Sequence, residues 1–92
     1  KISVIEKPEI SALQVYPNPV SDQAVVSFEA SSSGTYSLRI MNLLGSLVDE
    51  QQHSFAEGLN TVTINFSGRN NGIYFVILQQ GNQVEKLKIV KE

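Results

Sequence analysis

Apolar and polar residues alternate along most of the chain, beginning at Ala12. The stretch 35–42 has the clearest pattern, because Tyr36, Leu38 and Ile40 are separated by single polar residues. A period of two places such side chains on one face of a β-strand. No segment has the i, i+3, i+4, i+7 spacing of an amphipathic helix, so the alternation predicts an all-β domain.

Turn-forming residues divide this pattern into seven short strands. We expect them at residues 12–16, 23–29, 35–42, 46–55, 60–66, 73–79 and 84–90. Gly45 and Gly81 fall between strands, where tight hairpins need a positive φ. This spacing is typical of a two-sheet antiparallel β-sandwich of immunoglobulin-like type, with a small barrel as the alternative. Residues 1–11 have no sustained period and are expected to be a linker ahead of one domain at 12–92.

Two prolines precede the second expected strand, in the stretch Tyr16-Pro17-Asn18-Pro19. Proline has no N–H to donate, fixes its own φ and biases the residue before it toward extended conformations. We therefore expect the stretch to lie at a sheet edge or to cross between strands. From these residues alone, two explanations stay open: a stiff crossover with no further role, and a motif that a partner reads.

The composition narrows the classes of function. The chain has 92 residues, no cysteine and a formal net charge of −2, so thiolate chemistry is unavailable and the charge does not call for a nucleic-acid partner. No apolar run approaches the roughly 18 residues of a membrane-spanning helix. Because the chain begins at Lys1 without a signal sequence, we expect it to be a fragment of a longer precursor.

No arrangement of residues predicts catalysis, a metal site or a bound cofactor. His53 is the only histidine; it shares strand parity with Asp49 and Gln51, but no carboxylate lies at a ligand spacing around it, and we expect it to face solvent. Asp49 and Glu50 are adjacent and should point to opposite faces of their strand. The glycines are scattered one per turn, so no phosphate-binding loop is expected. These patterns favour a domain that is not an enzyme.

Two features are poorly explained by packing alone. The strand at 73–79 is apolar on both faces, whereas a strand of a sandwich normally has one face in water. Its outer face should meet another domain, another copy or a receptor, unless the methylene stems of Lys86 and Lys88 cover it. The basic end of the chain, residues 86–91, either binds a partner or only discourages edge-to-edge pairing.

The order of these motifs resembles a known family. Tyr-Pro-Asn-Pro at 16–19, a strand ending in the Gly45 turn, Gly72-x-Tyr74 before an apolar strand, the Gly81 hairpin and a lysine-bearing last strand follow one another. Over residues 13–91 the chain resembles the type A C-terminal sorting domain of the Bacteroidetes type IX (Por) secretion system. The chain departs from the family at its last residue, glutamate, where members tend to end on a basic or apolar residue.

The resemblance implies a secretion signal and not an enzyme. In the family, the folded domain takes a cargo from the periplasm through an outer-membrane translocon; a sortase-like cysteine peptidase then usually removes the domain, and the cargo reaches the cell surface or is released. The implied partners are the translocon and its shuttle proteins, the peptidase and the upstream cargo. Cleavage would fall within or upstream of residues 1–11. The implied recognition residues are Pro17, Asn18, Pro19, Gly72, Tyr74, Gly81, Lys86, Lys88 and Lys91.

The sandwich fold leaves one rival from another class of function. A fibronectin-like or carbohydrate-binding accessory module of a secreted enzyme would have the same strands and turns. It would sit between domains and bind glycans, whereas the sorting domain would sit at the C-terminus of its precursor.

Overall fold

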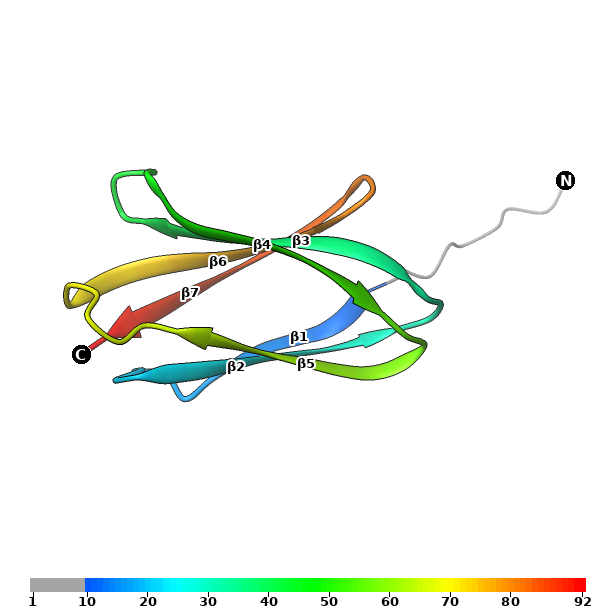
Figure 1. The fold of residues 1–92 in the computed structure, drawn as a ribbon, viewed down its shortest axis with the longest axis horizontal. Helices are drawn as coiled ribbons and strands as arrows, with labels where there is room; N and C mark the ends of the chain where they lie inside the picture. The colour runs from blue at the N-terminus through cyan, green and yellow to red at the C-terminus, as the bar shows by residue number, and fades with distance from the viewer. Residues whose placement is uncertain (1–9) are drawn as a thin grey trace, which may run out of the picture.

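The computed structural model describes residues 10–92, which form a sandwich of seven strands and contain no helix (Figure 1). The strands are β1 (Ile10–Tyr16), β2 (Gln23–Ala30), β3 (Gly34–Asn42), β4 (Leu47–Phe55), β5 (Gly58–Asn65), β6 (Gly72–Gln80) and β7 (Gln83–Lys91). Each begins and ends within two residues of the position that the sequence predicts. Ile10 and Ser11, expected in the linker, belong to β1, and residues 1–9 lie outside the described part of the chain.

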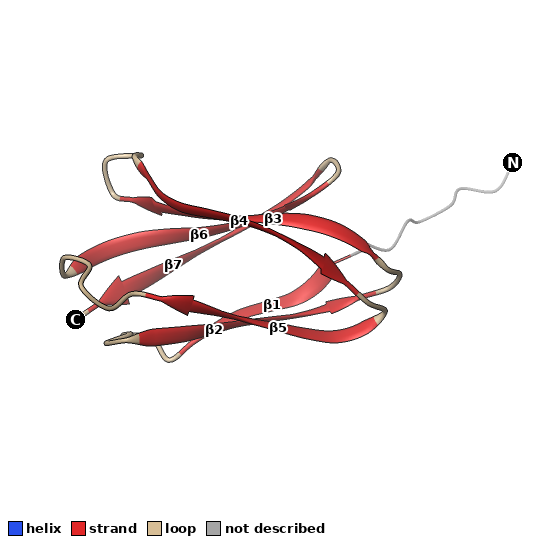
Figure 2. Ribbon diagram, in the orientation of Figure 1, coloured by secondary structure: helices blue, strands red, loops and turns tan. Residues whose placement is uncertain are grey.

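The strands form two antiparallel sheets that face one another (Figure 2). One sheet has the order β1-β2-β5 and the other the order β4-β3-β6-β7. The chain crosses between the sheets three times, after β2, β4 and β5. The predicted immunoglobulin-like sandwich is therefore confirmed. The barrel alternative is wrong, because each sheet keeps two edge strands.

The inward-facing side chains of the two sheets meet in one apolar core. Three aromatic rings fill part of it: Phe28 lies edge-on to Tyr36 and Phe55, with centroids 5.1 and 6.1 Å apart. The alternation predicted for β3 is confirmed, because the side chains expected to point inward are the buried ones. The buried core residues are Ile10, Val20, Ala24, Val26, Phe28, Ala30, Tyr36, Leu38, Ile40, Phe55, Ile64, Phe66, Tyr74, Val76, Leu78 and Ile89.

The prediction that His53 faces solvent is wrong. The register of β3 and β4 places His53 opposite Tyr36, on the core side of the sheet, and their ring centroids lie 5.6 Å apart. Its Nε2 lies 2.7 Å from Oε1 of Gln51, and Nε2 of Gln51 donates to Asp49 at 3.0 Å. The pattern misled because β4 is an edge strand, where inward side chains stay half-buried and can be polar. Burial also raises the pKa of the Tyr36 hydroxyl.

Two phenylalanine variants test which face of the sheet is the core. Phe28→Ala should lower the free energy of unfolding by about 3–5 kcal/mol, because it removes a fully buried ring. Phe75→Ala should cost clearly less, since Phe75 lies on the outer face of β6 and is only half-buried. Urea denaturation followed by circular dichroism measures both losses. Equal losses would contradict the assignment of inner and outer faces.

Candidate recognition surface

The proline stretch lies along the free edge of β7, as the sequence predicts for a segment poor in donors. β7 is the last strand of its sheet, so one of its edges has no neighbouring strand. The side-chain amide of Asn18 occupies part of this edge: the Val90 N–H donates to Oδ1 of Asn18 at 2.9 Å, and Nδ2 of Asn18 donates to the Lys88 carbonyl at 3.4 Å. One amide therefore supplies the donor and acceptor that a paired strand would supply.

Val20 continues this pairing with its backbone. Its N–H donates to the Val90 carbonyl at 2.8 Å, and its carbonyl accepts from the Glu92 N–H at 2.9 Å. Val20 is fully buried, so the segment is also held by packing. We call residues 18–20 the edge segment. Four hydrogen bonds join it to residues 88–92, which are about 70 positions away along the chain.

The two prolines flank Asn18 and are exposed. The peptide bonds that precede them, Tyr16–Pro17 and Asn18–Pro19, are both cis. Because proline has no N–H, neither residue brings an unpaired donor to the edge of the sheet. The sequence predicts the edge location of this stretch but not its cis geometry.

The other end of β7 is held by a second side-chain amide. Oε1 of Gln83 accepts from the Ile10 N–H at 3.1 Å, and Nε2 of Gln83 donates to the Ile10 carbonyl at 2.5 Å. Between the two amides, Val84 and Lys86 have the same parity as Val90 and so direct their backbone groups to the same free edge. Sequence reasoning missed Gln83, because a glutamine beside a hairpin glycine reads as an ordinary turn residue.

The three lysines of the last strand do not act as one group. Lys86 and Lys88 are exposed on the outer face of the sheet, and Nζ of Lys86 lies 4.6 Å from the centre of the Phe75 ring. Lys91 has the inward parity of Ile89 and is only 9% exposed, with Nζ 3.5 Å from the Glu92 carbonyl. The structure therefore brings two of the predicted lysines together and places the third on the core side.

The outer face of β6 is apolar and half-buried. Its residues are Ile73, Phe75 and Ile77, and the register sets Phe75 between Met41 of β3 and Lys88 of β7. We call these five residues together with Lys86 the outer sheet face. Lys86 covers part of the Phe75 ring, so the lysine-stem explanation is right in part, yet apolar surface stays open to solvent.

Arg39 borders the outer sheet face on β3. Its guanidinium donates to Oε1 of Gln79 at 2.6 Å and lies 3.8 Å from a carboxylate oxygen of Glu50. These contacts engage the Arg39 charge within its own sheet. The positive charge left for a partner on this face therefore comes mainly from Lys86 and Lys88.

The predicted glycines and tyrosine shape the ends of β6. Gly72 has a φ of 147° at the start of the strand, and Gly81 has a φ of 58° in the hairpin that follows it. Tyr74 packs its ring on Phe66 with centroids 5.4 Å apart, and its hydroxyl donates to the Asn70 carbonyl at 2.7 Å. Tyr74 thus fixes the loop that leads into β6, and its ring is buried.

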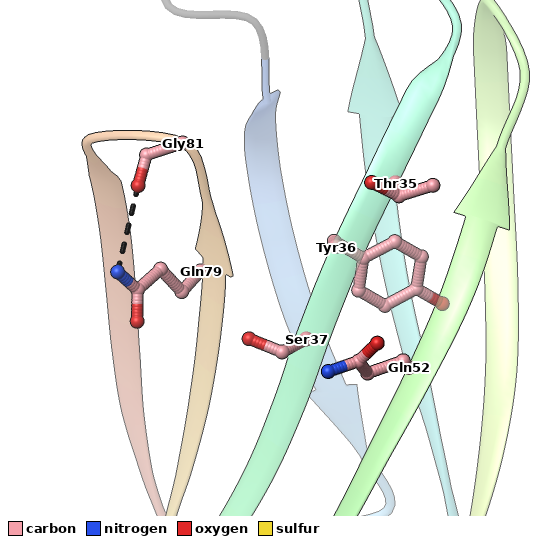
Figure 3. Close-up of a pocket in the computed structure, with 6 residues that line it drawn as sticks. All are labelled: Thr35, Tyr36, Ser37, Gln52, Gln79 and Gly81. Carbon is pink, nitrogen blue, oxygen red and sulfur yellow. Dashed lines mark hydrogen bonds between the residues drawn. The ribbon is translucent and has the colours of Figure 1, made fainter.

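A polar hollow of about 340 Å³ lies where the β6–β7 hairpin diverges from β3 (Figure 3). Its lining residues are Thr35, Tyr36, Ser37, Gln52, Gln79 and Gly81. Gln79 turns toward the hairpin and donates to the Gly81 carbonyl at 3.4 Å. No charged side chain lines the hollow, so its hydroxyls have no neighbouring base within it.

Two further searches cover residues 10–92. Within them, no group of three or more His, Cys, Asp or Glu side chains is placed to hold a metal ion. The same residues include no helix long and apolar enough to cross a membrane.

Solved structures contain the same fold within much larger proteins. Dimeric latent PorU from Porphyromonas gingivalis matches with a TM-score of 0.67 and 14% identity, over 86% of this chain and 9% of that one. A β-glucosidase from Erythrobacter marinus matches with a TM-score of 0.58 and 12% identity, over 90% of this chain and 15% of that one. A β-glucosidase from Listeria innocua in complex with isofagomine matches with a TM-score of 0.52 and 11% identity, over 90% of this chain and 16% of that one.

At these identities the likeness establishes the fold alone, which a sorting domain and an accessory module share. The chain spans less than a fifth of the length of each of these proteins. A sequence search of curated proteins found no match.

A comparison with protein families distinguishes a sorting domain from an accessory module. The family described as the secretion system C-terminal sorting domain matches residues 14–92. This range contains the edge segment, the Gly45 turn and all of β7, so the motifs that carried the resemblance lie within the match. The chain therefore belongs to the C-terminal sorting domains of the type IX secretion system, the family of C-terminal secretion signals.

Proposed function

We propose that this domain directs an upstream cargo protein through the type IX outer-membrane translocon, and that the edge segment and β7 are read together as the signal. The observation that carries the proposal is the set of four hydrogen bonds between residues 18–20 and 88–92. Because of these bonds, Pro17, Asn18 and Pro19 lie beside the last strand, and the two parts present one continuous surface.

The chemistry of the outer sheet face supports a protein partner. Lys86 and Lys88 flank apolar side chains that remain partly open to solvent. A partner with carboxylates around an apolar patch would complement this surface in both charge and polarity. Gly72, Tyr74 and Gly81 contribute indirectly, since they fix the ends of β6, which carries the apolar part of the face.

The position of the termini suits this role. β1 begins beside Gln83, whereas the edge segment and the end of β7 lie at the opposite end of the sandwich (Figure 1). A cargo joined upstream of Ile10 would therefore leave the surface near Asn18 and Val90 uncovered. Lys91, although mostly buried, lies within this end of the molecule and pairs with Gly72.

The proposed course begins in the periplasm, where the folded domain meets the translocon and its shuttle proteins, and ends with the cargo at the cell surface or in the medium. A sortase-like cysteine peptidase would remove the domain by cutting within or upstream of residues 1–11. The domain itself would act by binding and not by catalysis.

A reporter fusion tests the function. A periplasm-directed fluorescent protein carrying residues 1–92 at its C-terminus should reach the surface or the medium of a host with a type IX system. In the same host without the translocon it should stay in the periplasm. Export that does not need the translocon, or no export at all, would contradict the proposed function.

Charge variants of the fusion test the basic part of the signal. Lys86→Gln with Lys88→Gln should reduce the exported fraction, because both side chains are exposed and a partner loses two positive charges. Lys86→Arg with Lys88→Arg is the matched control and should export normally. Normal export of the glutamine variant would remove these lysines from the proposed signal.

Asn18→Ala tests the joint between the two parts. It removes both amide hydrogen bonds to β7 and should lower the free energy of unfolding by about 1–2 kcal/mol, with a fall in export. Asn71→Ala, at an exposed position outside the strands, should leave the urea midpoint unchanged. If Asn18→Ala changed neither stability nor export, the edge segment would be a crossover with no further role.

A further inference from the structure

The turn between β3 and β4 ends in an exposed apolar tip that the proposed signal does not use. Leu43 is 63% exposed, Leu44 is 90% exposed, and nearby Leu47 is 54% exposed. Single exposed leucines are common on protein surfaces, but three within five positions form a cluster that packing does not explain. We call Leu43 and Leu44 the leucine tip.

The backbone holds the leucine tip in one conformation. Oδ1 of Asn42 accepts from the Leu44 N–H at 3.0 Å and from the Ser46 N–H at 2.9 Å. The Asn42 N–H also donates to the Ser46 carbonyl, and Gly45, with a φ of 84°, donates to the Asn42 carbonyl. Little backbone freedom is left for a partner to remove, so the tip can bind without a large entropic cost.

The hollow beside the leucine tip is lined by uncharged residues. A hollow of about 290 Å³ separates the tip from the start of β6, and among its lining residues are Asn70, Asn71 and Ile73, none of them charged. Ile73 also belongs to the outer sheet face, so the tip extends that face toward the end of the molecule that carries the C-terminus (Figure 1).

We propose that the leucine tip inserts as an anchor into a preformed apolar pocket on a protein of the secretion machinery, while the outer sheet face packs beside it. This inference rests on the proposed function and names the part of the domain that gives binding its energy. A small, rigid, exposed apolar group that enters a pocket loses most of its contact with water, so it contributes more to binding than the flatter surface beside it, which stays partly solvated.

Two other occupants fit the tip less well. A single myristoyl chain gives only marginal membrane binding, and two leucine side chains present fewer carbons, with no lysine in the turn to add attraction to anionic lipid. A dimer built on the tip alone would bury on the order of a few hundred Å², well below the roughly 1,000 Å² of a stable interface. Adding the outer sheet face to either contact does not remove the difficulty. Lys86 and Lys88 are fewer than the basic residues of a polybasic membrane patch, and a symmetric dimer would bring the same positive charges of both copies into one interface. A protein partner with carboxylates around its pocket has neither disadvantage.

The reporter fusion described above tests the anchor. Leu43→Asn with Leu44→Asn should lower the exported fraction at least about tenfold, because two leucine side chains no longer gain from burial in the pocket. Leu59→Asn is the matched control, because Leu59 is 71% exposed on β5 in the other sheet, and it should export normally. Leu43→Met with Leu44→Met should also export normally, since it keeps the apolar tip.

The outcomes separate this inference from the proposed function. If the wild-type fusion is exported through the translocon and the asparagine variant is exported equally well, the anchor is overturned and the function stands. The double variant should unfold at the same urea concentration as Leu59→Asn, which shows that the substitutions do not weaken the fold. If its midpoint is lower, the single variant Leu44→Asn is used in the export experiment in place of the double variant. Two further measurements test the other occupants. The proposed protein pocket would be overturned if the purified domain floated with phosphatidylglycerol vesicles and the leucine variant did not. It would also be overturned if light scattering showed a dimer that the leucine variant no longer formed.

Discussion

The free edge of β7 is the constraint on which the rest of the structure depends. A last strand at the edge of a sheet exposes a row of backbone donors and acceptors, which can pair with any other chain. Here the Asn18 amide and the Val20 backbone occupy this edge near the end of β7, while near its start the side chain of Gln83 bonds the backbone of Ile10 in β1. The C-terminal strand is thereby fixed to the first strand and the loop that follows it, so the two ends of the domain form one unit.

This arrangement explains why a proline motif near the start of the domain belongs with a basic strand at its end. Val90 accepts and donates hydrogen bonds with residues 18–20, although some 70 positions separate them. Under the proposed function, a partner that binds the end of β7 would contact Pro17 and Pro19 at the same time. Recognition would then require the folded domain, because neither segment alone presents this surface. The outer sheet face and the leucine tip extend it along one side of the sandwich.

The sequence predicted the architecture well, because each strand repeats a simple alternation and each turn has its own residue signal. The pairing of Asn18 with β7 could not be predicted, since it joins a turn to a distant strand edge and leaves no local pattern. The same limit applies to Gln83. His53 and Lys91 were harder to place for a shared reason. Both are polar residues at inward positions near the rim of the core, where the alternation of polarity does not indicate which face of a strand is buried.

The leucine tip illustrates the opposite case. Leu43 and Leu44 sit beside a glycine turn, and their hydrophobicity alone would place them in the core. Only the hydrogen bonds of Asn42, which end β3 and form the turn, place them outside. The alternation of polar and apolar residues therefore does not predict whether apolar residues in a turn are buried or exposed.

Amide hydrogen exchange measured by NMR on the unmodified domain tests the central claim most directly. If the edge segment pairs with β7, the amides of Val90, Val20 and Glu92 should be protected, because each donates a hydrogen bond at that edge. The amide of Lys86, which faces the same edge between the two side-chain amides, should exchange much faster. Exchange of Val90 as rapid as that of Lys86 would contradict the account, since the proline motif and the last strand would then not be joined in solution.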